Sequence, residues 1–306
     1  MDGRNKSGHD GAILTACALP PLFITKDPRV LIIAQISDLH VRPAGQTAYG
    51  IDTNALFADA LRAVRALRPA PDCVLVTGDL TDCGLEAEYE IARAGLATLP
   101  MPVFVIPGNH DRREPFRRHL SSAFSYLDHD RPHLDYVDDR FAVRLIGLDS
   151  LIDGETYGDL APHQLDWLDA RLSEGEKPTL VFVHHPPFRT GISAMDDLWL
   201  RSGDALGRVL ARHNGVQRLL AGHYHRPITA MFGGTLAFCA PSIAHQVALD
   251  LAPGQPTRFI MEPPAFALHT WRPDIGMTTH LTPIRDYGPG FDVVLEADYP
   301  GAPVHA

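Results

Sequence analysis

The chain has 306 residues, of which 45% are hydrophobic, and its 27 basic and 37 acidic residues give a formal net charge of −10. This length and composition are enough to bury a full hydrophobic core, which excludes a mainly disordered protein. The negative charge and the lack of any long Lys/Arg cluster argue against nucleic acid as a partner, because binding to phosphate backbones needs concentrated positive charge. Any phosphate that this protein handles must therefore be attracted locally.

The N-terminal residues 1–28 are expected to form a loosely ordered extension. Leu14-Thr15-Ala16-Cys17 is similar to a lipoprotein cleavage site, but few apolar residues precede it and Pro20-Pro21 interrupt the segment. We therefore expect a cytoplasmic protein, with export as the alternative. The four cysteines have no C-x-x-C spacing and are expected to be reduced thiols. No run reaches the roughly 18 apolar residues that cross a bilayer, so no membrane partner is expected.

Strands and helices are predicted to alternate in the first half of the chain. Short apolar runs predict strands at Val30–Ile36, Cys73–Thr77 and Val103–Ile106. Between them we expect one helix that is capped by Asp52 or Thr53 and ends before Pro69, and a second at Leu85–Leu99. This β-α-β-α-β order implies a parallel sheet whose strands end at one common edge.

The second half is expected to begin with a hairpin between Asp135 and Asp149. It then continues with a helix at Pro162–Leu172, a strand at Leu180–Val183, a long lid-like loop at Pro186–Asp197, a helix near Gly203–Arg212 and a strand at Val216–Ala221. From Ile228 onward, short runs predict antiparallel strands. We expect a catalytic domain at 29–250 and a C-terminal arm or cap at 251–306 that serves oligomerisation, in a homodimer or higher homo-oligomer.

Polar residues follow five of these strands. The motifs are Asp38-Leu39-His40, Gly78–Asp82, Gly108–Asp111, His184-His185-Pro186 and Gly222–His225. Together they offer seven metal donors, which are too many for one tetrahedral zinc ion and about right for two ions. The predicted donors are Asp38, His40, Asp79, Asn109, His184, His223 and His225.

Asp79 is the expected bridge between the two ions, because it follows the middle one of the three upstream strands and a carboxylate has two oxygens for two metals. Asp38, His40 and one downstream histidine would complete the ligand set of one ion. Asn109, His184 and the other downstream histidine would complete the ligand set of the second ion. These residues alone do not decide which ion His223 binds and which ion His225 binds.

Two ions roughly 3.5–4 Å apart suit in-line displacement at phosphorus by a hydroxide that bridges them. His110, which directly follows Asn109, is the candidate to stabilise charge on the phosphate or to protonate the leaving alkoxide. Asp82 is the candidate to orient the His110 imidazole and raise its pKa, with a plain turn residue as the alternative. The residues thus predict binuclear-metal-dependent hydrolysis of a phosphate ester.

Other conspicuous residues are assigned less specific roles. His185, Tyr224 and Asp149 are expected to pack or to support the ligands from behind. Arg112 and Arg113 are expected at the surface, within reach of a phosphate beside His110. Ordinary strand positions are expected for His245, His269 and His280.

As a set, the five motifs resemble those of the calcineurin-like metallophosphoesterase superfamily, D-x-H, G-D-x-x-D, G-N-H-D/E, H-x-P and G-H-x-H, over about residues 30–233. The residues within and beside these motifs are most similar to those of class III cyclic-nucleotide phosphodiesterases and related glycerophosphodiesterases. Ala240-Pro241-Ser242 and Glu262-Pro263-Pro264 are similar to that branch as well.

The resemblance implies an α/β fold, a four-layer α/β/β/α sandwich of two mixed sheets flanked by helices. It also implies a first ion on Asp38, His40, Asp79 and His225, and a second on Asp79, Asn109, His184 and His223. The implied metals are iron, manganese, zinc or cobalt, and the implied substrate is a small phosphodiester such as cyclic AMP or a glycerophosphodiester. The alternatives are a phosphomonoesterase or protein phosphatase with the same metals, and a non-catalytic scaffold with the same fold.

Overall fold

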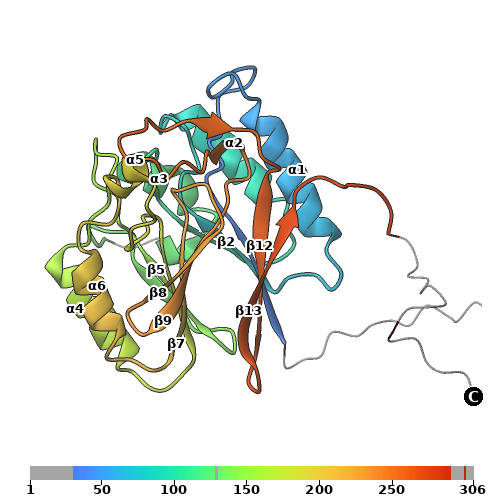
Figure 1. Ribbon diagram of the computed structural model, residues 1–306. Helices are drawn as coiled ribbons and strands as arrows, with labels where there is room; N and C mark the ends of the chain where they lie inside the picture. The colour runs from blue at the N-terminus through green and yellow to red at the C-terminus, as the bar shows by residue number, and fades with distance from the viewer. Residues whose placement is uncertain (1–29, 128–129, 291–299, 301–306) are drawn as a thin grey trace, which may run out of the picture.

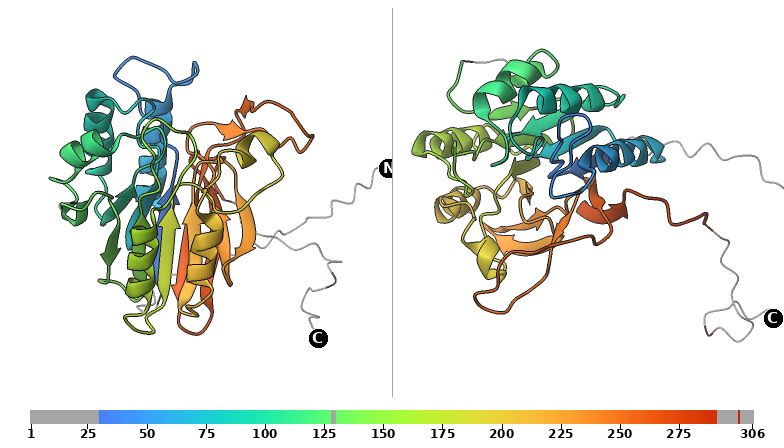
Figure 2. Two further views of the ribbon diagram at one scale, coloured as in Figure 1. Left: turned by 90° about the vertical axis from the view of Figure 1, so that its left-hand side faces the viewer. Right: turned by 90° about the horizontal axis from the view of Figure 1, so that it is seen from above.

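The computed structural model describes residues 30–127, 130–290 and 300, so the N-terminal extension expected at 1–28 lies outside the described residues. Two β-sheets pack face to face, with α1 and α2 on one side and α4 and α6 on the other (Figures 1 and 2). Within the described ranges, no helix has the length and apolar character needed to cross a bilayer.

The first sheet has the strand order β13-β12-β1-β2-β3. Its parallel part consists of β1 (Leu31–Ile36), β2 (Cys73–Thr77) and β3 (Val103–Ile106), connected by α1 (Thr53–Ala66) and α2 (Glu86–Leu96). The predicted β-α-β-α-β unit is therefore confirmed. Asp52 caps α1 by accepting a hydrogen bond from the Ala55 backbone N–H at 3.0 Å, which satisfies one of the unpaired donors at the helix start.

The second sheet has the order β4-β5-β6-β7-β9-β8. Its strands are β4 (Tyr136–Asp138), β5 (Arg144–Leu148), β6 (Thr179–Val183), β7 (Val216–Ala221), β8 (Ile228–Phe232) and β9 (Thr235–Cys239). Strands β5, β6, β7 and β9 run parallel, whereas β4 and β8 pair antiparallel at the two edges. The expected hairpin between Asp135 and Asp149 is the β4–β5 pair.

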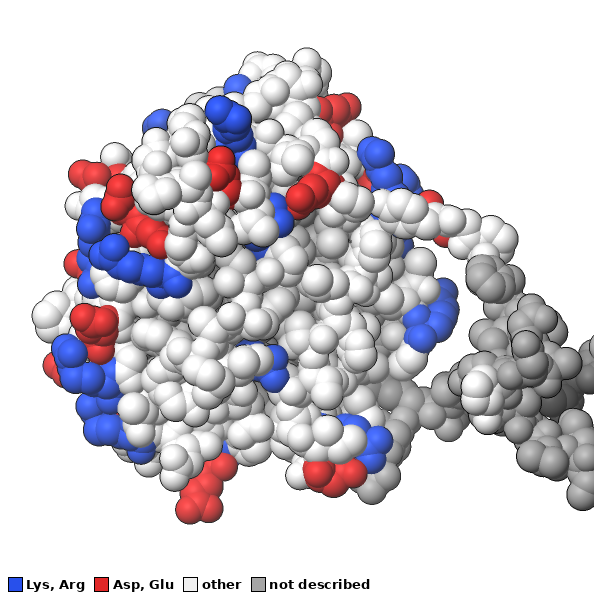
Figure 3. All heavy atoms as spheres, viewed as in Figure 1, with Lys and Arg blue, Asp and Glu red and all other residues white. Residues whose placement is uncertain are grey.

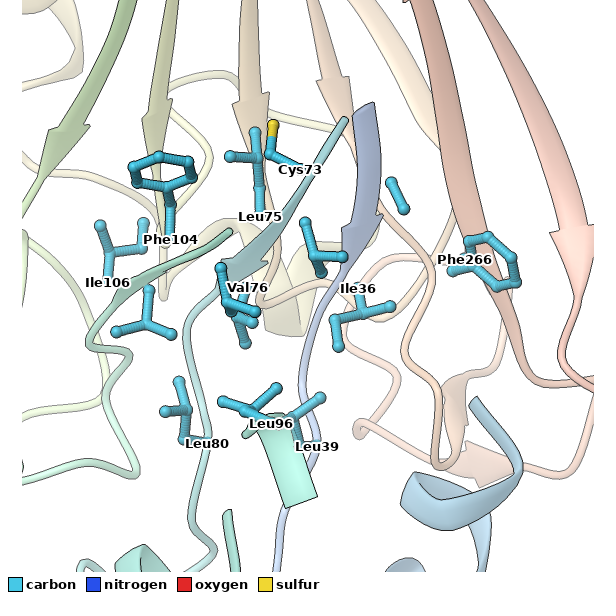
Figure 4. Close-up of a cluster of buried hydrophobic side chains, with 14 of the residues drawn as sticks. Ile36, Leu39, Cys73, Leu75, Val76, Leu80, Leu96, Phe104, Ile106 and Phe266 are labelled. Carbon is cyan, nitrogen blue, oxygen red and sulfur yellow. The ribbon is translucent and has the colours of Figure 1, made fainter. Parts of the chain in front are cut away.

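Side-chain alternation along β6 shows how the layers are stacked. Leu180 and Phe182 belong to the core between the two sheets, whereas Val181 and Val183 pack with the residues of α4 (Pro162–Leu172) and α6 (Gly203–Leu210). A strand that is apolar on both faces is what a sheet covered on both sides requires. Figure 4 shows the core between the sheets, with Phe104, Leu75 and Phe266 among its members. The predicted four-layer sandwich is confirmed.

The C-terminal strands differ from the expected arm. β12 (Ala265–Arg272) pairs antiparallel with β1, and β13 (Gly276–Pro283) pairs with β12, so both belong to the first sheet. Phe266 and Ala267 lie in its core, so the expected boundary at residue 250 does not separate this hairpin from the domain. The reason is that β1 is buried on both sides and its backbone needs a hydrogen-bonded neighbour at each edge.

A small two-stranded arm precedes β12. It consists of β10 (Gln246–Val247) and β11 (Phe259–Ile260), and it lies near α5 (Ser193–Asp196) at the top of Figure 1. The Gly254 backbone N–H, in the segment between β10 and β11, donates to Ser193 Oγ at 3.3 Å. The expected long loop at Pro186–Asp197 thus carries a short helix and contacts this arm.

The helix α3 (Arg113–Leu120), and the 3-10 turn at Ser125–Leu127 that follows it, were not predicted. Only Phe116 and Leu120 are buried in α3, and the intervening residues are charged, so the apolar pattern is too sparse to indicate a helix. This helix begins directly after the Gly108–Asp111 motif and therefore supports it from one side.

Replacing Phe104 by alanine tests the core between the sheets. Phe104 is fully buried, and its ring lies 5.3 Å from Tyr126 and 6.4 Å from Tyr136 of the opposite sheet. We expect Phe104→Ala to lower the free energy of unfolding by about 3–5 kcal/mol, because it leaves a cavity that both sheets line. Met231→Ala on β8, where the side chain is 73% exposed, should change it by less than about 0.5 kcal/mol in the same urea titration. Equal losses would contradict this account of the core.

Candidate metal centre

The seven predicted donors lie just beyond the carboxyl ends of strands in both sheets. Asp38 and His40 follow β1, Asp79 follows β2 and Asn109 follows β3 of the first sheet. The histidines follow β6 and β7 of the second sheet: His184, His223 and His225. The centre therefore forms where the edges of the two sheets meet.

Five of the predicted donors have an unusual backbone. Six described residues other than glycine have a positive φ, and five of them are Asp38 (54°), His40 (48°), Asp79 (49°), His223 (69°) and His225 (50°). This left-handed conformation is unfavourable for residues with a Cβ and is concentrated at functional sites, where surrounding packing enforces it. Here it turns the donor side chains back toward the sheet edge.

Two motif glycines leave no space for a side chain. A Cβ on Gly108 would lie 2.2 Å from Asp79 Oδ1, and one on Gly78, which has φ +97°, would lie 2.3 Å from His184 Nδ1. These positions bring the backbone directly against the donors, which explains why the motifs need glycine there.

One group of donors consists of Asp38, His40, Asp79 and His225, whose ligand atoms all lie within 4.8 Å of one another. His40 Nδ1 lies 3.1 Å from Asp82 Oδ1, and His225 Nδ1 lies 2.8 Å from the His245 carbonyl oxygen. Both Nδ1 atoms must donate, because carboxylate and carbonyl oxygens only accept. The two Nε2 atoms face each other at 3.2 Å, and in neutral rings both would carry lone pairs, an arrangement that a cation would stabilise.

The remaining donors form a second group around His184. Its Nδ1 donates to the Thr77 carbonyl oxygen at 2.8 Å, which leaves Nε2 at 3.2 Å from Asn109 Oδ1 and 3.4 Å from Asp79 Oδ2. His223 Nε2 is buried and has no hydrogen-bond partner among the described residues. His184 and His223 offer ring nitrogens within 4.8 Å of each other, in a group that also includes His185.

Asp79 lies between the two groups. Its Oδ2 atom is 3.4 Å from His184 Nε2 and 3.8 Å from His40 Nε2, whereas its Oδ1 atom accepts the His110 backbone N–H at 2.9 Å. The carboxylate therefore turns one oxygen toward both groups. The sequence predicts that its two oxygens are divided between two metals, and Oδ1 also accepts the His110 backbone N–H.

The electrostatics of the site favour positive charge. Burial, the largest single cause, would raise the pKa of Asp38, but the neighbouring His225 and His184 together lower it to about 2. Burial would likewise lower the pKa of His184, but Asp79, Asp38 and the Thr77 carbonyl together raise it to about 9. The same field would bind divalent cations, so the residues fit two metal ions.

The two predicted catalytic residues lie beside the first group, but their contacts differ from those expected. The Asp82 carboxylate accepts from His40, and it is the Asp82 backbone carbonyl that holds His110 Nδ1, at 2.8 Å. The Asp82 carboxylate is farther from His110, with 3.8 Å between Asp82 Oδ1 and His110 Nδ1. Asp82 therefore orients a predicted metal ligand with its side chain and His110 with its backbone.

Two further residues occupy places that the sequence did not indicate. Arg113, expected at the surface, donates from Nε to the buried Asp149 at 2.7 Å and so ties the start of α3 to the end of β5. His245, expected in a strand, lies just before β10, and its ring centroid is 4.7 Å from that of His225. Both ring nitrogens of His245 are buried without a partner among the described residues.

A cavity of about 220 Å³ opens directly above the donors, and its lining includes His40, Asp79, Asn109, His223 and His225. A larger groove of about 600 Å³ lies on the other side of His110. Both are lined in part by Asn109, His110 and Thr156, so the two spaces meet at the metal centre.

The family model that describes calcineurin-like phosphoesterases matches residues 31–227, which include all seven donors. The chain belongs to the calcineurin-like phosphoesterase family. This membership confirms the expected phosphoesterase class. The fold agrees as well: this phosphoesterase shares it with the crystal structure of a dimetal phosphatase from Danio rerio, at a TM-score of 0.58 and 17% identity, over 81% of this chain and 98% of that one.

Named relatives point to one branch of the family. A probable glycerophosphodiester phosphodiesterase GpdQ of Arcobacter nitrofigilis is 37% identical over 260 residues, which cover 84% of this phosphoesterase and 94% of the relative. The 3',5'-cyclic adenosine monophosphate phosphodiesterase CpdA of Escherichia coli (strain K12) is 30% identical over 231 residues, covering 75% and 82%. This is the branch that the residues of the motifs resembled.

Removing the Asp82 carboxylate tests its support of His40. Without an acceptor at Nδ1 the His40 ring loses its fixed tautomer, so Asp82→Ala should weaken manganese binding by roughly 10–100-fold in calorimetric titrations of the metal-free protein. Asp82→Asn should lose less, because its amide oxygen still accepts. Asp166→Ala, an exposed position on α4, should bind as the unmodified protein does. If Asp82→Ala bound manganese as tightly as Asp166→Ala, His40 would not depend on Asp82.

Proposed function

We propose that this protein is a binuclear-metal-dependent phosphodiesterase that hydrolyses small phosphodiesters. The observation that carries the proposal is the position of Asp79 Oδ2, which lies 3.8 Å from His40 Nε2 and 3.4 Å from His184 Nε2. One carboxylate oxygen shared by two donor groups is the arrangement that a pair of nearby cations needs.

The proposed ligands divide between the two ions as the groups do. Asp38, His40, Asp79 and His225 would hold the first ion, and Asp79, Asn109, His184 and His223 the second. When bound, the ions supply Lewis acidity toward the phosphate and lower the pKa of a water molecule. Mixed imidazole and carboxylate ligands support iron, manganese, zinc or cobalt as the ions.

His110 is the proposed proton donor to the leaving alcohol. Its Nδ1 is held by the Asp82 carbonyl oxygen, so Nε2 is the ring nitrogen left for a substrate. The ring lines both the cavity and the groove, and its centroid lies 4.7 Å from that of His40. Asp82 takes part through both of its hydrogen bonds, as a positioning residue.

The substrate is proposed to be a cyclic nucleotide or a glycerophosphodiester, as the names of the relatives GpdQ and CpdA suggest. A cavity of about 220 Å³ supports a small ester rather than a protein substrate. On the face shown in Figure 3, basic and acidic side chains are interspersed, which supports the exclusion of nucleic acid. The alternative, a phosphomonoesterase with the same metals, would show a clear kinetic preference for p-nitrophenyl phosphate over its diester.

Two further proposals concern the oligomeric state and the location of the protein. Leu249, Leu251 and Met261 are exposed on and around the β10–β11 arm, which supports a homo-oligomer that covers them. Cys239 is a buried free thiol, which supports a reducing location such as the cytoplasm.

Hydrolysis of bis(p-nitrophenyl) phosphate tests the proposed function. We expect turnover by the metal-loaded protein, its loss with EDTA and its return with added manganese. Asp79→Ala should fold but lose activity by at least about 1,000-fold, because it removes the oxygen that both donor groups share. Asp166→Ala should retain full activity. An Asp79→Ala protein as active as Asp166→Ala would contradict the proposal.

A leaving-group series tests His110. His110→Ala should slow diesters of poorly leaving alcohols, such as methyl esters, about 100-fold or more, because an alkoxide of high pKa needs a proton to depart. Esters of p-nitrophenol should lose much less, since that phenolate leaves unaided. Comparing kcat for the two classes gives the answer, and a uniform loss would show that His110 acts in another way.

A further inference from the structure

Tyr49 is the one described non-glycine residue with a positive φ, 52°, that is not a predicted metal donor. Ala48 and Ile51 exchange two backbone hydrogen bonds of 3.0 and 2.8 Å around it, and the following Gly50 has φ 79°. Tyr49 and Gly50 are therefore the central residues of a two-residue turn of type I′, where Asn, Asp or Gly is preferred. A bulky aromatic residue is strained there, and such strain is concentrated at functional sites and ligand clamps.

Burial does not explain why a tyrosine occupies this position, because the residue is 60% exposed. Its ring instead lies 4.8 Å from that of Phe259 in β11, in a T-shaped contact, and 5.4 Å from that of His245. Phe259 is itself 44% exposed. Two segments that are far apart in sequence thus meet through half-exposed rings beside the metal centre.

The cavity above the donors has walls unlike its floor. The floor consists of the metal donors, whereas the walls are formed by apolar side chains, which are those of Tyr49, Met195, Leu198, Val247 and Phe259. Polar groups are also present in this lining, namely the Tyr49 hydroxyl, Thr156, Thr257 and the His245 ring. The apolar part of the walls suits a planar or apolar group.

The groove on the other side of His110 has the opposite character. Its lining includes Arg112, Glu114, Asp153 and Glu155, all charged, and it is the larger of the two spaces at about 600 Å³. An acyclic phosphodiester has two separate arms, and at this site they would enter these two different surroundings. The alcohol departs with a proton and into water, so the polar groove beside His110 is the better place for it.

We infer that Tyr49 and Phe259 form a binding subsite for a planar group on the ester arm that stays on phosphorus, while the leaving alcohol occupies the charged groove. The inference rests on the proposed phosphodiesterase function and narrows its substrate class. The enzyme then prefers diesters whose retained arm is aromatic or a nucleobase over those whose retained arm is a small alkyl group.

Diesters that share one leaving group test this subsite. In ethyl p-nitrophenyl phosphate and phenyl p-nitrophenyl phosphate only the retained arm differs, and thymidine 5'-(p-nitrophenyl phosphate) adds a nucleobase. With the manganese-loaded protein we expect kcat/KM to be about 10-fold or more higher for the phenyl and thymidine esters than for the ethyl ester, as stacking of one planar group implies.

Variants of the two rings separate binding from structure. Tyr49→Gly removes the ring and relieves the turn, so its thermal midpoint should stay equal or rise while the phenyl-over-ethyl preference falls toward one. Tyr49→Phe should keep the preference, and Phe259→Ala should lower it. Tyr287→Ala removes a tyrosine that is 72% exposed and lines neither space, so it should keep both preference and stability.

The outcomes distinguish the inference from the function beneath it. If the unmodified protein hydrolyses all three esters without preference, or if Tyr49→Gly keeps the preference, the subsite is wrong and the phosphodiesterase function stands. If the manganese-loaded protein hydrolyses none of them, the proposed function fails and the subsite falls with it.

Discussion

Acceptor atoms that face one another across a buried space are the constraint on which the rest of this structure depends. His40 Nε2 and His225 Nε2 lie 3.2 Å apart, and Asp79 Oδ2 lies near both His40 and His184. In a protein interior such an arrangement is unfavourable unless positive charge is present. The fold therefore gathers these side chains where they need positive charge, which protons or metal cations can supply.

Two hydrophobic clusters stabilise the fold and so hold the donor side chains in this geometry. The core between the sheets includes residues of both, such as Phe104 and Phe182, and a separate cluster packs the second sheet against α4 and α6. Because both sheets are covered on both faces, their strand ends are fixed relative to each other. That rigidity allows five donor residues to keep a left-handed backbone that isolated peptides avoid.

Much of the fold and of the donor set could be predicted from the sequence, since apolar runs indicate buried strands and polar motifs at their ends indicate a shared edge. What could not be predicted depends on contacts between distant residues. The Asp82 carboxylate turns to His40 rather than His110, and Arg113 pairs with Asp149; nothing in local spacing encodes either direction. The position of His245 depends on how the β10–β11 arm folds over the site.

The C-terminal strands illustrate the same limit. Their alternation indicated strands correctly, but a pattern does not identify the pairing partner, and β12 pairs with the distant β1 as well as with its sequence neighbour β13. For α3, two apolar residues among charged ones gave too weak a signal, although the helix supports the Gly108–Asp111 motif.

The pairing of the first strand with β12 also has a consequence for biosynthesis. All seven donors leave the ribosome before β12 does, yet one edge of β1 stays open until that late strand arrives. Non-local pairing of this kind is slow and leaves an unpaired edge exposed in the nascent chain. Completion of the first sheet therefore waits for a segment translated after all seven donors, and not for the part that performs the chemistry.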